Sequence, residues 1–235
     1  MNEQVERDVM EYDVLIIGGG PSGLSSAIKV KQLASSEGKE VSVCVLEKGS
    51  EIGAHILSGN VFEPTALNEL IPDWKEKEAP LNSPATKDIV KFMISENSSI
   101  NIPFPSFLIP TFNNHGNYVM SLANFTRWLA TQAESLGVEI FPGFTAAEVI
   151  FEENVVKGVL TGEMGISKDG EKKPSYQPSM ELRGKYTVFA EGCRGHLGKQ
   201  LIKKFNLDEN RDPQHYGIGF KEIWDISPED HKEGT

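Results

Sequence analysis

Cysteine is scarce in this sequence, and long apolar runs are missing. The 235 residues contain only two cysteines, Cys44 and Cys193, and no C-x-x-C pair. Two isolated cysteines build neither a disulfide framework nor a cysteine-ligated cluster, so a reducing compartment is expected. No apolar run approaches the roughly 18 residues that a membrane-spanning helix needs. Any membrane contact is therefore expected to be peripheral or monotopic.

Positive charge is in deficit. There are 23 Lys and Arg against 34 Asp and Glu, which gives a formal net charge of −11. Such a surface repels phosphates, so nucleic acid is excluded as a partner. The first eleven residues, Met1 to Glu11, are acidic and have neither the apolar core of a signal peptide nor the Arg/Ser bias of a transit peptide. A bacterial-type cytoplasmic start is expected.

The first fifty residues contain a strand pattern, a helix pattern and a second strand pattern, in that order. Tyr12 to Ile17 is a continuous apolar run, which is typical of a parallel strand covered on both faces. From Ser22 to about Ala34 apolar residues recur at helical spacing, and Val41 to Leu46 is a second β-branched run. Together these segments predict one βαβ unit.

A glycine-rich turn joins the predicted strand and helix. Residues 18–23 read G-G-G-P-S-G and satisfy the G-x-G-x-x-G pattern in the context that its mechanism requires. Gly18 permits the tight turn, Gly20 lets the backbone approach a pyrophosphate, and Gly23 allows close helix packing while the helix N-terminus faces the anion. The residues predicted to bind a dinucleotide here are Ile17, Gly18, Gly19, Gly20, Pro21, Ser22 and Gly23.

An acidic residue ends the second strand. Glu47 lies 24 residues after Gly23, where a carboxylate can accept both hydrogen bonds of an adenosine ribose diol and disfavour a 2′-phosphate. Lys48 follows it and is assigned to the same site. A glutamate at a strand end can also be merely solvated. Because FAD and NAD share an adenosine diphosphate half, the βαβ unit alone does not choose between them.

The remaining chain is less regular. Prolines in 49–101 predict an excursion, and those in 102–112 an extended segment. A helix is expected over 122–136 and a strand over 138–141, followed by a hairpin at 149–160. Residues 162–179 are expected to form an exposed loop or hairpin tip. A strand at 186–190 leads through 191–195 into a helix at 197–205, which makes a second strand–turn–helix junction.

This second junction resembles that of an FAD-binding class that includes flavin monooxygenases and geranylgeranyl reductases. In that class a strand ending in Asp-Gly lies near the flavin, whereas this sequence has Glu191 and Gly192, with one more methylene in the acid. The resemblance assigns both residues to the cofactor site. A structural cap on the following helix is an equally open interpretation of Glu191.

Four stretches carry a closer resemblance: G-A-H-I-L-S-G at 53–59, P-D-W at 72–74, N-N-H-G-N-Y at 113–118 and F-A-E-G-C-R-G-H-L at 189–197. Collinearly from Tyr12 to about Trp224, the chain resembles the electron-transfer flavoprotein:ubiquinone oxidoreductases. The resemblance implies a reaction that passes electrons from reduced electron-transfer flavoprotein through FAD and a [4Fe-4S] cluster to ubiquinone. It needs no protein nucleophile, so no catalytic side chain and no metal ligand is assigned to this chain.

The same resemblance implies a membrane location and a cluster-binding region that this chain does not contain. It places the protein at the cytoplasmic face of a bacterial inner membrane, or at the mitochondrial inner membrane in eukaryotic relatives, with 53–74 as the contact segment; burial of that segment is the alternative. The family's cluster needs four cysteines that this chain does not have. The chain is therefore expected to be the N-terminal portion of a longer protein.

The predicted fold class is α/β: an FAD-binding Rossmann-type domain with a parallel sheet, interleaved with the start of a mixed-sheet α+β domain. The expected divisions are 1–100 (βαβ unit and excursion), 101–180 (mixed-sheet quinone side), 181–205 (return to the FAD domain) and 206–235 (a further, truncated segment). Two other functions stay open. One is a geranylgeranyl-reductase-like or monooxygenase-like flavoprotein, and the other is a nucleotide-binding fragment without activity of its own.

Overall fold

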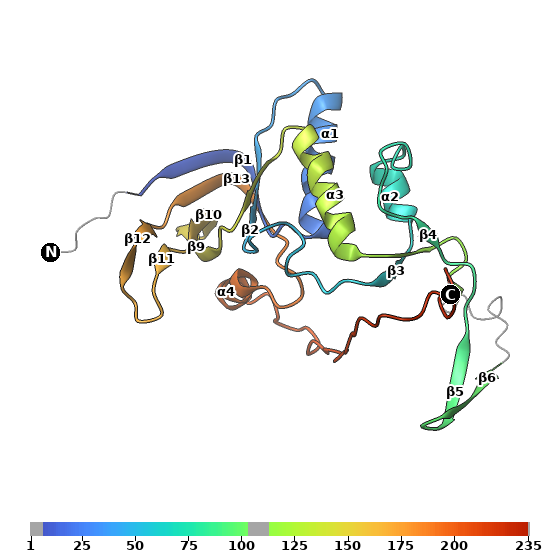
Figure 1. Ribbon diagram of the computed structural model, residues 1–235. Coiled ribbons are helices and arrows are strands. Elements are labelled where there is room, and N and C mark those ends of the chain that lie inside the picture. The colour runs from blue at the N-terminus through green and yellow to red at the C-terminus, as the bar shows by residue number, and fades with distance from the viewer. Residues whose placement is uncertain (1–6, 103–112, 235) are drawn as a thin grey trace. The chain divides into compact units, whose positions relative to one another are not determined.

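The computed structural model describes residues 7–102 and 113–234 (Figure 1). The chain forms two compact units, each made of two separate stretches of sequence. Unit 1 comprises Met1–Ile56 and Thr126–Tyr216, and unit 2 comprises Leu57–Phe125 and Gly217–Thr235. None of the helices in the described ranges is long and apolar enough to cross a bilayer.

Unit 1 is built on a six-stranded mixed sheet with the order β8-β2-β1-β13-β10-β9. The first four strands run parallel, and β10 and β9 continue the sheet in antiparallel fashion. The strands are β1 (Val9–Ile17), β2 (Val43–Glu47), β8 (Glu139–Pro142), β9 (Ala146–Glu152), β10 (Val155–Thr161) and β13 (Glu181–Phe189). The unit also contains α1 (Pro21–Ser36), most of α3 (Leu122–Ser135), the β11–β12 hairpin (Met164–Ile166 and Lys172–Gln177) and α4 (His196–Phe205).

The core of unit 1 follows from the apolar runs of its central strands. Leu15 and Ile16 of β1 are fully buried, as a parallel strand covered on both faces requires. One face is covered by α1, whose Leu24, Ala27 and Ile28 are also fully buried. In Figure 1 the blue β1 lies beside the orange β13, its parallel partner over nearly its whole length. This pairing brings the two strand–turn–helix junctions to one edge of the sheet.

The predicted fold class is confirmed, and so are the βαβ unit, the 149–160 hairpin and the second junction. The compact units do not follow the sequence-based divisions at 100, 180 and 205. Strands β8, β9 and β10 lie between residues 101 and 180, yet they hydrogen-bond into the sheet of β1 and β2. Contiguous divisions could not anticipate this, because the sheet order interleaves distant segments. The assignment of 101–180 to the quinone side stays a prediction.

Unit 2 contains short antiparallel elements and no further βα repeat in its described residues, as the prolines of 49–101 predicted. A three-stranded sheet has the order β3-β7-β4, and β5 and β6 form a separate two-stranded ribbon. The bounds are β3 (Asn60–Phe62), α2 (Thr65–Leu70), β4 (Ser83–Pro84), β5 (Val90–Ser95), β6 (Ser98–Ile102) and β7 (Tyr118–Met120). The expected extended segment 102–112 lies almost entirely outside the described residues.

The proposed membrane segment 53–74 is divided between interior and surface. Leu67, Ile71 and Trp74 are buried, and the Trp74 indole packs edge-on against Tyr118 with ring centroids 5.7 Å apart. Leu57 is exposed. For the three buried side chains, burial within the fold is the correct interpretation, because groups that face the interior of unit 2 have no apolar surface left for lipid.

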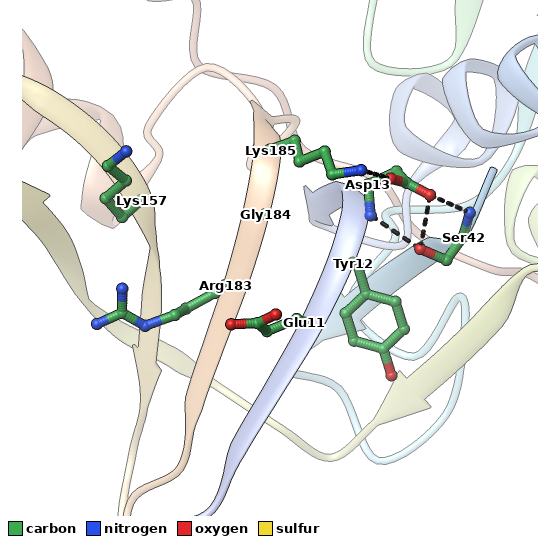
Figure 2. A pocket seen from close by; sticks show the side chains of 8 residues that line it. All are labelled: Glu11, Tyr12, Asp13, Ser42, Lys157, Arg183, Gly184 and Lys185. Atoms are coloured by element: carbon green, nitrogen blue, oxygen red, sulfur yellow. Dashed lines mark hydrogen bonds and ion pairs between the residues drawn. The ribbon is translucent and has the colours of Figure 1, made fainter.

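A polar network crosses the sheet of unit 1 from the middle of β13 and β1 to the start of β2 (Figure 2). The Asp13 carboxylate of β1 accepts hydrogen bonds from the Ser42 amide (2.8 Å) and hydroxyl (3.0 Å) and forms an ion pair with Lys185 of β13 (2.6 Å). Lys185, followed by the Ser42 hydrogen bonds, lowers the Asp13 pKa to about 2. Asp13 therefore links three neighbouring segments of the sheet.

Replacing Asp13 by asparagine is expected to remove a pH-dependent part of the stability. A depressed folded-state pKa favours the charged form, so the contribution is present above the ordinary aspartate pKa of 3.8 and is lost as the pH falls toward about 2. Urea unfolding at low salt should therefore separate the variant from the parent near neutral pH, with the gap closing below about pH 3. Glu11→Gln is the control, because Glu11 forms no ion pair within the described ranges. A gap that persists unchanged at low pH would contradict the assignment.

Candidate functional site

The first junction of unit 1 is a tight turn between β1 and α1. Gly18 has a φ of +111°, which residues with a side chain rarely adopt, and a Cβ atom there would lie 2.4 Å from the Ala190 carbonyl oxygen. The Gly18 amide donates to the Leu46 carbonyl (2.8 Å), and the Ala190 amide donates to the Ile17 carbonyl (2.8 Å). The turn is therefore held between the ends of two neighbouring strands.

The missing side chains of Gly20 and Gly23 have different consequences: open space in front of α1 at Gly20, and close helix packing at Gly23. Gly20 caps α1 with an extended backbone and no side-chain hydrogen bond, and a Cβ atom there would meet nothing within 4 Å. A Cβ atom on Gly23 would lie 2.0 Å from the Gly18 carbonyl oxygen, so this glycine lets α1 pack on the turn. Since Pro21 has no amide hydrogen, the first donors of the α1 terminus are those of Ser22 and Gly23. The helix end is open to an anion.

Glu47 is already held at the end of β2. Its Oε2 accepts from the Gly19 amide (2.9 Å) and its Oε1 from the Gly49 amide (2.7 Å). Each carboxylate oxygen has a further lone pair, so the group can still accept two hydroxyl donors. The half-buried carboxylate thus fixes the glycine turn and presents acceptors beside it.

Glu191 caps the second junction. Its two carboxylate oxygens accept from the amides of Leu197 (3.0 Å) and Gly198 (2.9 Å), in the first turn of α4. The helix-cap interpretation is therefore confirmed. Glu191 and Gly192 also line the pocket described next, and a direct contact with a cofactor stays a prediction.

These elements surround a pocket of about 910 Å³ in unit 1. Its size suits a large organic ligand. Every residue that the sequence assigned to the cofactor site lines this pocket except Gly23, which lies behind the turn. Its lining comprises Ile17, Gly18, Gly19, Gly20, Pro21, Ser22, Leu46, Glu47, Lys48, Gly53, His55, Ile56, Phe144, Thr145, Ala146, Phe189, Ala190, Glu191, Gly192, Arg194, Gly195 and His196.

Sequence reasoning missed the wall formed by 144–146. The Phe144 amide donates to the Glu47 carbonyl (3.1 Å), and the Gly143 amide donates to the Gly49 carbonyl (2.7 Å). These bonds hold the β8–β9 connection against the end of β2. A signal was present, because a strand was predicted just before Gly143 and parallel strands end at the same sheet edge.

Comparisons with known proteins agree with this geometry. Residues 16–71 match the family model of an NAD(P)-binding Rossmann-like domain. The solved structure of a geranylgeranyl bacteriochlorophyll reductase-like protein from Thermoplasma acidophilum superposes with a TM-score of 0.55 at 21% identity, covering 81% of this chain and 42% of that one. At this identity the likeness establishes the fold alone.

Two curated relatives are much closer in sequence. The electron transfer flavoprotein-ubiquinone oxidoreductase of Pseudomonas aeruginosa is 60% identical over 98% of this chain, which covers 42% of that protein. The Dictyostelium discoideum protein of the same name, termed mitochondrial, is 52% identical over 97% of this chain, which covers 37% of it. Over nearly its whole length this chain is therefore similar to proteins named electron transfer flavoprotein-ubiquinone oxidoreductase, and it spans about two fifths of the length of these relatives.

Proposed function

We propose that the protein containing this chain is an FAD-dependent oxidoreductase that accepts electrons from reduced electron transfer flavoprotein and delivers them to ubiquinone. The pocket of unit 1 supports the first part: an uncapped helix end, open space at Gly20 and a Glu47 carboxylate held with acceptors to spare. The names of the relatives support the electron donor and acceptor.

FAD fits this pocket through its adenosine diphosphate half. Glu47 would accept the ribose hydroxyls, and the amides at the start of α1 would bind the pyrophosphate. Bound FAD would supply the redox chemistry, for which amino-acid side chains have no equivalent. The role of this chain is to bind and orient it. His55 and His196 line the pocket as neighbours of the ligand, and neither is assigned a proton transfer.

The iron–sulfur cluster does not fit this chain. Four thiolates are the usual ligand set, and the sequence has two cysteines, of which Cys44 is buried on β2 and Cys193 is exposed. We therefore assign cluster ligands to the part of the relatives that this chain does not cover.

Purified natural-length protein tests the proposal. Its absorption spectrum should show flavin, mass analysis of the released chromophore should identify FAD, and reduced electron transfer flavoprotein should drive reduction of a quinone analogue. Flavin without quinone reduction, together with turnover of an alkene or of dioxygen, would favour the geranylgeranyl-reductase-like or monooxygenase-like alternative. A protein that binds nucleotide and transfers no electrons would be a binding module.

Peripheral membrane contact is the second part of the proposal, at the cytoplasmic face of the inner membrane in bacteria. It is supported by the β5–β6 ribbon of unit 2. Phe92 pairs with Ile100 and Val90 with Ile102, so these side chains share one face. Phe92, Ile94 and Ile100 are all more than half exposed. An apolar ribbon face in water is typical of a surface that inserts into an interface.

Substituting aspartate for both Phe92 and Ile100 is expected to release the protein from lipid. Zwitterionic vesicles are the appropriate probe, because the net charge of −11 repels anionic ones. Removing two apolar anchors should lower the vesicle-bound fraction at least about tenfold in sedimentation. Met93→Asp is the control, since Met93 is 60% exposed on the opposite face of the ribbon. Equal losses in both variants would show that the apolar face is not the contact.

A further inference from the structure

Around the pocket of unit 1, the acidic side chains have hydrogen-bond partners, whereas the basic side chains have no ion-pair partner among the described residues. Glu47 and Glu191 each accept two backbone amides, so their negative charge is already stabilised. Lys48 and Arg194 line the same pocket and, as far as the described residues show, neither forms an ion pair. In a chain of net charge −11, unpaired cations around one pocket favour an anionic ligand there.

Arg194 differs from Lys48 because it has an aromatic partner. The Arg194 guanidinium lies over the Tyr216 ring, 4.9 Å from the centroid. The Tyr216 hydroxyl donates to Gln214 Oε1 (2.9 Å), so the ring itself and not the hydroxyl contacts Arg194. A guanidinium that lies over a ring face can keep N–H groups available for a further acceptor, in the fork that matches phosphate oxygens.

The loop that carries Arg194 begins beside the glycine turn. The Gly195 amide donates to the Gly192 carbonyl (3.3 Å), so residues 192–195 form a turn. This turn begins two residues after Ala190, whose carbonyl oxygen lies against Gly18. The loop with Arg194 therefore starts beside the glycine turn that ends at the open terminus of α1.

We propose that Arg194, which lies over the Tyr216 ring, is a second pyrophosphate-binding group of this pocket, acting together with the α1 amides. The inference rests on the proposed function and adds a residue to it. One helix terminus carries about half a positive charge, whereas a pyrophosphate diester carries two negative charges. Arg194 supplies a full positive charge and directional N–H donors, and so neutralises part of the phosphate charge that the helix end leaves uncompensated.

The test compares a nucleotide, ADP, with its nucleoside, adenosine, on natural-length protein from which bound nucleotide has been removed. Calorimetric titration of Arg194→Gln should show ADP binding weakened about tenfold, as the loss of a charge-assisted contact predicts, with adenosine binding unchanged. Tyr216→Leu should weaken ADP binding by a smaller factor, and Tyr216→Phe, which keeps the ring, should leave it nearly unchanged. The matched control is Arg211→Gln, an exposed arginine outside the pocket lining.

Two outcomes would overturn the inference. ADP binding that Arg194→Gln leaves intact would remove the contact, and an equal loss of ADP and adenosine binding would show damage to the pocket rather than loss of a phosphate contact. Failure of the proposed function looks different, because it is measured on the parent protein, which would then contain no FAD or would not reduce a quinone analogue, whatever Arg194→Gln does to ADP binding.

Discussion

Replacing Gly20 by valine is expected to abolish flavin binding while the fold stays intact. The backbone at Gly20 has φ −79° and ψ 178°, which any residue adopts, and a Cβ atom there meets nothing within 4 Å. The protein therefore tolerates the side chain, whereas a pyrophosphate approaching the start of α1 meets it. Affinity should fall at least about 100-fold, or ~2.8 kcal/mol.

Flavin content of the purified variant, together with its thermal unfolding midpoint, measures this prediction. Gly219→Val is the matched control, because a Cβ atom on Gly219 also meets open space and this glycine is not among the pocket residues. After removal of bound nucleotide, both variants should unfold at the midpoint of the parent, and as purified only Gly20→Val should be colourless. Full flavin occupancy in Gly20→Val would refute the placement of the pyrophosphate.

Gly23→Ala is expected to lower the free energy of unfolding even without any nucleotide, in contrast to Gly20→Val, which affects ligand binding alone. A methyl group on Gly23 would lie 2.0 Å from the Gly18 carbonyl oxygen and 3.2 Å from Ile16 Cγ2. Alanine normally stabilises a helix over glycine by about 1 kcal/mol, but here α1 must move away from the turn. Such overpacking typically costs about 1–3 kcal/mol.

Gly198→Ala, in the first turn of α4, is the matched control for Gly23→Ala. A Cβ atom on Gly198 would meet only Glu191 Oε2, at an ordinary 3.7 Å, so alanine should be neutral or stabilising. Urea unfolding of both variants measures the difference in free energy. If Gly23→Ala proves as stable as the parent, α1 does not pack on the turn as described.

The parts of the fold that depend on local pattern were predictable. The run before Ile17, the glycines at 18–23 and the acid at Glu47 each have a short-range physical meaning, and together they located one side of the pocket. The wall at Phe144 and the position of Arg194 over the Tyr216 ring depend on which distant segments the sheet brings together. No periodicity carries that information.

The segment 53–74 shows that an apolar pattern does not by itself identify the surface it covers. The apolar residues around Trp74 have helical spacing, but spacing alone does not say whether an apolar face meets lipid or the rest of the chain, and Trp74 is buried. The alternation across Phe92 and Ile100 was also present in the sequence. Its meaning became visible only with the ribbon register, which places both side chains on one exposed face.

The Glu191 cap favours one orientation of a dinucleotide in the pocket. Two helices begin at this edge of the sheet, and both termini would attract phosphate if left free. The α4 terminus is occupied by a carboxylate of its own chain, whereas the α1 terminus has no side-chain cap. The phosphates of a dinucleotide can therefore bind at the α1 terminus but not at the α4 terminus. Glu47, the ribose acceptor, lies beside the α1 terminus, so the adenosine end of the ligand is expected on that side. Head-to-tail reversal of the ligand is thereby disfavoured before any contact with its reactive end is made.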